Sequence, residues 1–267
     1  MKRLGLVLAA AVLAALVLAA LAPHLFAGQD PLAVDSGQTL RPPSAEHLLG
    51  TDENGRDVLA RIVHGTRTSL LLGFGAIAVA LVCGGLLGIA AGLGNRLVEN
   101  VIMRLSDIGL AFPELLLALV VITVAGGGTG NAMLAIGVAN IPNYARLVRA
   151  QTLAIRRSSY VEAAYALGLS APRVILRHVL PNAVKPVLIL ATIGVGTALV
   201  AGSALSFLGL GTPPPEPEWG SMLSTARNFI SRAWWYGVFP GAAITLTVIS
   251  VTVVGRALRL RSEGRTW

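Results

Sequence analysis

The chain has 267 residues, of which 54% are hydrophobic and 13% are charged, and its mean hydropathy is +0.72. Soluble domains usually contain about a quarter charged residues, and their helices alternate apolar with polar positions. Here long apolar runs have no polar face, which predicts helices surrounded by lipid. A net charge of +8 would suggest nucleic acid as the partner of a soluble protein, but membrane proteins gather Lys and Arg in cytoplasmic loops. The composition therefore excludes an ordinary soluble domain and favours the lipid bilayer over nucleic acid.

Six segments are apolar enough to be membrane-spanning helices, which need about 20 residues. The first also resembles a secretory signal, but Pro23 directly after it is a poor cleavage context, so we expect an uncleaved helix. The fourth is the weakest because Asn140 and Pro142 interrupt it. In chain order, the predicted spans are residues 4–21, 69–93, 108–125, 132–148, 187–208 and 237–254.

The basic residues predict the orientation of these spans. With the N-terminus inside, 15 of the 21 Lys and Arg residues fall in inner segments, and the reverse orientation would violate the positive-inside rule. Both termini are then cytoplasmic. The predicted organisation is an N-terminal transmembrane helix at 1–25, an extracytoplasmic segment at 26–68, a membrane domain at 69–258 with an inner loop at 149–186, and a cytoplasmic tail at 259–267.

Two of the predicted spans have small residues at every fourth position. Such a stripe lies on one helix face and lets a second helix approach closely within lipid. The second helix could belong to this chain or to another subunit. The stripes are Gly84, Gly88 and Gly92 in the second span, and Gly194, Ala198 and Gly202 in the fifth.

The inner loop has its own helical pattern. Residues 160–168 form a short predicted helix, which Gly168 ends as glycine commonly does. A second segment, 171–179, leads to Pro181, which is expected to end it because proline does not fit a helix interior. We therefore predict a helix–turn–helix on the cytoplasmic face. It could be a solvated basic loop, but its alanine face favours a docking surface.

The sequence of this loop resembles a known signature. Glu162-Ala163-Ala164, then Gly168 and Pro181, is similar to the EAA motif of the permeases of bacterial ABC importers, although His178 stands where that pattern has isoleucine. In that family the loop forms a coupling helix that inserts into a cleft on the ATPase subunit. The resemblance therefore implies ATPase coupling by Glu162, Ala163, Ala164, Gly168 and Pro181.

Other stretches narrow the resemblance to C-type subunits of dipeptide and oligopeptide permeases. These are residues 47–57 with 65–70, 206–211, 217–223, and Trp234-Trp235 with Phe239-Pro240-Gly241. The resemblance covers residues 47–259. It implies an all-α, six-helix permease of type I ABC importer architecture in the bacterial inner membrane.

The implied partners are a second homologous permease, two cytoplasmic ABC ATPases that bind ATP and Mg²⁺, and an extracytoplasmic peptide-binding protein. Related C-type subunits serve nickel importers, so nickel remains an alternative substrate. The Trp234-Trp235 pair favours the peptide branch.

Polar residues at membrane depth are candidates for the transport pathway, because burying them in hydrocarbon is costly. Asp107 and Glu114 lie near the inner end of the third span, and Asn140 lies in the fourth. Asp107 could instead lie at the interface and pair with Arg104.

Two outer stretches are candidates for docking the binding protein. One is the turn containing Asp52, Arg56 and Asp57, and the other is Trp219 beside a proline-rich stretch. The turn is no calcium loop, because the fifth position counted from Asp52 is Arg56 and the twelfth is Val63.

No metal site or cofactor is expected in this chain. The four histidines, His24, His47, His64 and His178, have no metal-ligand spacing. No Gly-rich loop ends in Gly-Lys-Ser or Gly-Lys-Thr, so we expect the chain not to hydrolyse ATP. A multispan membrane enzyme would need a polar catalytic cluster, and an ATP-independent channel would have no use for a coupling loop. Neither alternative explains the sequence as well as a transport subunit does.

Overall fold

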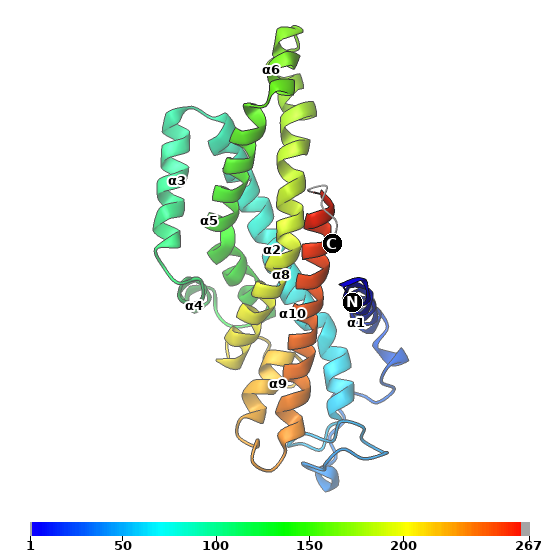
Figure 1. Ribbon diagram of the computed structural model, residues 1–267. Coiled ribbons are helices and arrows are strands. Elements are labelled where there is room, and N and C mark those ends of the chain that lie inside the picture. Colours follow the sequence, from blue (N-terminus) through cyan, green and yellow to red (C-terminus); the bar gives the residue numbers. More distant parts are fainter. Residues whose placement is uncertain (1, 263–267) are drawn as a thin grey trace.

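Residues 2–262 are described by the computed structural model, in which long helices run side by side (Figure 1). The apolar runs form these helices because a helix satisfies all of its backbone hydrogen bonds internally, as lipid requires. The helices are α1 (Lys2–Leu21), α2 (Val58–Leu93), α3 (Arg96–Leu110), α4 (Glu114–Ala125), α5 (Thr129–Arg156), α6 (Ser159–Ala166), α7 (Ala171–Val174), α8 (Leu180–Phe207), α9 (Trp219–Ala226) and α10 (Trp234–Ser262). Short 3-10 turns cover Pro23–Leu25 and Ser36–Gln38, and a π-helical turn, Ile175–Val179, joins α7 to α8.

Helices α2 and α5 form the centre of the bundle, and the first small-residue stripe lies between them. A Cβ added at Gly84 would lie 2.7 Å from the Ile141 carbonyl oxygen, and one added at Gly88 would lie 2.6 Å from that of Ala145. A Cβ at Gly92 would meet Thr152 at 2.7 Å. The partner of this stripe is therefore α5 of the same chain.

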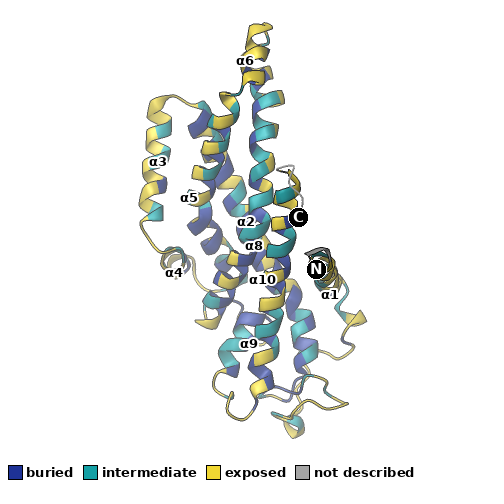
Figure 2. Ribbon diagram, viewed as in Figure 1, coloured by how far each residue is buried: buried dark blue, intermediate teal, exposed yellow. Residues whose placement is uncertain are grey.

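The second stripe also packs within the chain. A Cβ added at Gly194 of α8 would overlap the Tyr144 hydroxyl on α5, and one added at Gly202 would overlap Leu72 on α2. Ala198, between them, is fully buried. Helix α8 thus completes an inner layer with α2 and α5, which Figure 2 shows as the most buried part of the bundle.

Several predicted spans belong to helices that extend beyond the predicted bounds. Helix α2 begins at Val58, not at residue 69, so the last part of the predicted outer segment is helical. Its 36 residues would extend about 54 Å, well beyond the ~30 Å of a bilayer core. Helix α8 is continuous with the turn before it, so an apolar helix runs from Ala171 to Phe207. Helix α10 continues to Ser262, and the rest of the predicted tail, 263–267, lies outside the described residues.

The third predicted span is not one straight helix. Helix α3 ends at Leu110, α4 begins at Glu114, and the two are bent by 96°. Pro113 explains the break, because proline disfavours a helical conformation for the residue before it.

By length and composition, the described residues contain four helices able to cross a membrane, or up to five if the bent pair counts as one span. Helix α5, which holds the predicted fourth span, is not among them; Asn140 and Asn143 reduce its apolar character. The count of six spans and the cytoplasmic position of both termini remain predictions.

Candidate functional site

Helix α6, the predicted coupling element, projects from one end of the bundle (Figure 1). The opposite end is formed by α9 and the loops that precede α2. This arrangement separates the inner and outer candidate residues along the whole length of the bundle.

One face of α6 is anchored by a small apolar cluster. Val161 and Ala164 are buried against Val174 and Val179, with Leu93 packed beside them. Glu162 and Ala163 lie on the exposed face. Only one of the two predicted docking alanines is therefore at the surface, because residues 161 and 164 share the inner face of the helix.

Gly168 ends this element as the sequence predicted. Its φ is +82°, in the left-handed region, and nothing lies within 4 Å of an added Cβ. The Gly168 N–H donates to the Tyr165 carbonyl at 2.9 Å, and the Leu169 N–H donates to that of Ala164 at 3.2 Å. These two bonds form a Schellman motif, which turns the chain out of α6.

Pro181 does not end a helix, contrary to the prediction. It is exposed in the first turn of α8, where a missing N–H has little cost. The π-helical turn before it keeps 171–179 continuous with α8. The predicted helix–turn–helix is thus a short helix α6 folded back on the end of a long one.

The pathway candidates Glu114 and Asn140 form a polar pair between α4 and α5. The Asn140 Nδ2 group donates to Glu114 Oε1 at 2.7 Å and to the Ile136 carbonyl at 3.0 Å. Asn140 is buried, and Glu114 is half-buried. Asp107 is separate from this pair: it is exposed and forms an ion pair with Arg146 of α5, not with Arg104.

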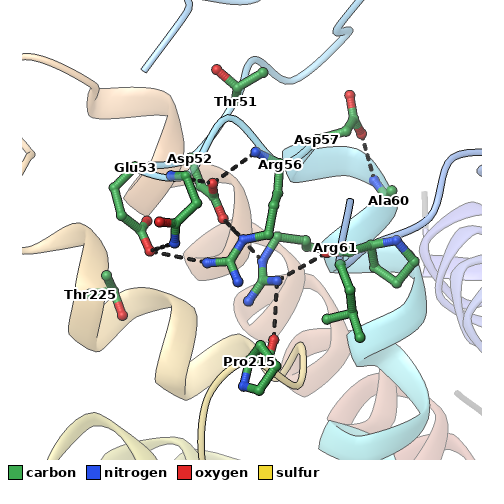
Figure 3. A network of polar contacts seen from close by, with 12 residues as sticks. Thr51, Asp52, Glu53, Arg56, Asp57, Ala60, Arg61, Pro215 and Thr225 are labelled. Carbon is green, nitrogen blue, oxygen red and sulfur yellow. Dashed lines mark hydrogen bonds and ion pairs between the residues drawn. The ribbon is translucent and has the colours of Figure 1, made fainter. Parts of the chain in front are cut away.

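At the opposite end, the predicted docking turn is a buried ionic cluster (Figure 3). The Asp52 carboxylate is fully buried and accepts from the backbone N–H groups of Asn54 and Arg56, at 2.8 and 2.9 Å. Arg56 Nε donates to it at 2.6 Å, and Arg61 Nε lies 3.4 Å away. Arg56 also bonds Glu53 at 3.0 Å.

Asp57 has a structural role in the same segment. It caps α2 by accepting from the Ala60 N–H at 2.7 Å, and it lies 2.9 Å from His47 Nδ1. Trp219 is fully buried, and its Nε1 group donates to the Ile62 carbonyl at 3.0 Å.

The side chains predicted to contact the binding protein are therefore buried rather than exposed at the surface. Asp52 and Trp219 have no exposed area, and Arg56 and Asp57 have little. The polar types of the turn suggested an exposed loop, but their charges are satisfied by one another inside the fold.

Sequence reasoning missed the buried Glu218. Its carboxylate caps α9 by accepting from the Gly220 and Ser221 N–H groups at 2.8 Å each, and Ser69 of α2 donates to it at 3.3 Å. Burial raises the pKa of Glu218 above its ordinary value, against the opposing effect of the hydrogen bonds. A carboxylate just before a helix start is a recognisable capping signal.

The described residues contain no group of three or more His, Cys, Asp or Glu side chains able to hold a metal ion. In this part of the chain the acids of the polar clusters are paired with Arg, Asn, Ser or His side chains.

A bundle of long apolar helices with a short surface helix at one end is the architecture of an all-α, multi-pass membrane protein. The chain belongs to the family of binding-protein-dependent transport system inner membrane components, whose model matches residues 84–267.

Named relatives agree with this family. A dipeptide transport system permease protein of Alkalihalophilus pseudofirmus is 45% identical over 220 residues, which are 82% of this chain and 72% of the relative. A di/tripeptide transport system permease protein of Pseudomonas aeruginosa is 43% identical over 226 residues, 82% of this chain and 75% of the relative. A glutathione transport system permease protein of Pectobacterium atrosepticum is 39% identical over 217 residues, 81% and 72% of the two chains.

Solved structures share the fold. An amino acid ABC transporter with histidines matches with a TM-score of 0.60 and 15% identity, over 75% of this chain and 94% of its own. The methionine ABC transporter MetNI in an inward-facing conformation matches with a TM-score of 0.58 and 19% identity, over 74% and 96%.

Proposed function

We propose that this chain is one of two membrane-spanning permease subunits of an ATP-driven importer of short peptides. Helix α6 is the observation that supports this most directly: it is anchored by one face, exposed on the other, and projects from the end of the bundle. The peptide substrate is supported by relatives that are named dipeptide, di/tripeptide and glutathione permeases.

In this proposal α6 couples the bundle to a cytoplasmic ATPase. Glu162 and Ala163 face outward, where a carboxylate can accept a charge-assisted hydrogen bond from a cationic group of the ATPase. Gly168 ends α6, and Pro181 lies in the first turn of α8, just after the turn that joins the coupling segment to that helix. The two ATPases bind ATP and Mg²⁺, and this chain needs no cofactor of its own.

Motion of α6 is transmitted to α8 because the two share an apolar cluster at Val174 and Val179, where the chain enters α8. Helix α8 packs on α2 and α5, so a displacement at the ATPase rocks the inner layer of the bundle. Rocking of packed helices around a central site is how transporters alternate access between the two sides.

Glu114 and Asn140 are the best candidates in this chain for lining the pathway. Their hydrogen bond holds a carboxylate at the bend between α3 and α4, where α4 leaves the direction of the bundle. We expect the second permease to complete the pathway, and Asp107 to serve as an interfacial ion-pair partner of Arg146.

The test is uptake by proteoliposomes that contain this chain, its partner permease, both ATPases and the binding protein. Labelled dipeptides should accumulate in an ATP-dependent manner, whereas nickel should not. Uptake of nickel but not of peptides would replace the peptide by the nickel alternative. Accumulation without ATP would contradict the importer itself.

A further inference from the structure

A large cavity lies at the end of the bundle opposite α6. Its volume is about 760 Å³, within the ~300–1,000 Å³ usual for small-ligand sites. Its walls come from segments far apart in the sequence: the ionic turn at Glu53 and Arg56, the start of α2 at Arg61, the loop 211–216, helix α9 at Thr225, and the start of α10.

Two buried arginines line this cavity. Arg56 is 7% exposed and Arg61 is 4% exposed. Figure 3 shows their guanidinium groups side by side, with Pro215 and Thr225 nearby. Two adjacent cations are costly to bury unless acceptors surround them.

The hydrogen-bond acceptors within the fold do not use all the N–H donors of Arg56 and Arg61. Arg56 uses Nε on Asp52 and Nη2 on Glu53. Arg61 uses Nη1 on the carbonyls of Pro31 and Pro215, at 3.1 and 3.2 Å. Arg61 Nε forms no hydrogen bond but is taken up by an ion pair with Asp52 at 3.4 Å, and in the described part of the chain no hydrogen bond involves Arg56 Nη1 or Arg61 Nη2.

We propose that this cavity is an entry site for the transported peptide, in which Arg56 and Arg61 bind its C-terminal carboxylate. A guanidinium group presents N–H donors in a fixed fork that matches a carboxylate. This inference rests on the proposed peptide substrate and adds the place where a permease subunit first receives it.

The size and walls of the cavity favour a peptide over a small inorganic anion. Met222 and the prolines 213–215 also line the cavity, and apolar groups of this kind suit side chains of varied size. Asp52 and Glu53 balance the two arginine charges, so binding is weak. Weak binding fits a transit site, which a substrate must also leave.

The test uses the complete transporter in proteoliposomes and two peptides, one with a free C-terminus and one amidated. The binding protein is titrated with both first, and uptake is measured with it saturated by each. Wild type should import the free peptide about tenfold faster, the effect of roughly one charge-assisted hydrogen bond. Arg56→Lys and Arg61→Lys should bring this ratio towards one, whereas Arg232→Lys, at an exposed outer arginine, should keep it.

A merely structural role would slow both peptides equally and leave the ratio unchanged, which would overturn the proposal. If neither arginine variant assembles, Thr225→Trp tests the site instead, because its side chain fills the cavity without disturbing an ion pair. It should slow the uptake of both peptides because the indole occupies the space that the peptide enters, while Asn228→Trp, exposed and outside the cavity, should not. Wild-type uptake by Thr225→Trp overturns the entry site alone; failure of the wild type to import either peptide overturns the proposed function as well.

Discussion

Gly168 shows how a single residue sets the geometry of the coupling element. At φ +82° a side chain with a β-carbon is strained by about 1–2 kcal/mol, and a β-branched one by more. Nothing crowds the position, so the backbone angle is the only obstacle to substitution.

We therefore expect Gly168→Val to leave the protein in the membrane but to abolish ATPase co-purification and peptide uptake. Gly168→Asn is the matched control, because asparagine tolerates the left-handed region. It should retain most of both activities. Wild-type coupling in the Gly168→Val variant would refute the assignment of α6.

Glu218 makes a second prediction at the residue scale. Its folded pKa is raised, so the fold favours the protonated form. The stability contributed by this group is complete below the unfolded pKa, ordinarily 4.5, and is lost as pH rises through the folded value.

The unfolding temperature of the detergent-purified protein should thus fall as pH rises above about 4.5. Glu218→Gln should flatten this dependence, although its own stability is lower because an amide cannot accept both backbone N–H groups. Parallel pH profiles of the two proteins would be inconsistent with a raised pKa.

At the scale of elements, the contact between α2 and α5 depends on the absence of side chains. The glycines at 84, 88 and 92 let the α5 backbone come within contact distance, where any β-carbon would overlap a carbonyl oxygen or a side chain. Overpacking of this kind typically costs about 1–3 kcal/mol.

Gly88→Ala should accordingly lower the unfolding temperature, since its Cβ would lie 2.6 Å from the Ala145 carbonyl oxygen. Gly85 is three residues away, and nothing lies within 4 Å of a Cβ added there. Gly85→Ala should therefore unfold at the wild-type temperature or slightly above it. Equal losses in both variants would contradict the close contact with α5 as the cause of the loss.

At the scale of the whole molecule, cysteine labelling tests which end of the bundle faces the cytoplasm. Substitution of Cys83 by alanine removes the sole native thiol. In that background, an impermeant thiol reagent added to intact cells should modify Ser36→Cys but not Ser170→Cys, because the two exposed positions lie at opposite ends of the bundle. Modification of Ser170→Cys without lysis would invert the topology on which the coupling and entry sites depend.

Much of this protein is determined by local sequence. Apolar length alone predicts membrane helices, the charge distribution predicts which end faces the cytoplasm, and Gly168 ends α6 because positive φ is a local property of glycine. Resemblance of the loop around Glu162 to the coupling motif likewise needs no tertiary information, and the family match agrees with it.

The tertiary structure decided which helices contact one another and which side chains are buried. It placed the glycine stripes against α5, divided the third predicted span at Pro113, and joined the segment before Pro181 to α8. It also moved Asp52 and Trp219 from an expected surface to the interior. The helix contacts depend on partners distant in sequence: Gly84 packs against Ile141 of α5, and Trp219 donates to the Ile62 carbonyl of α2, and no local pattern records that these segments meet.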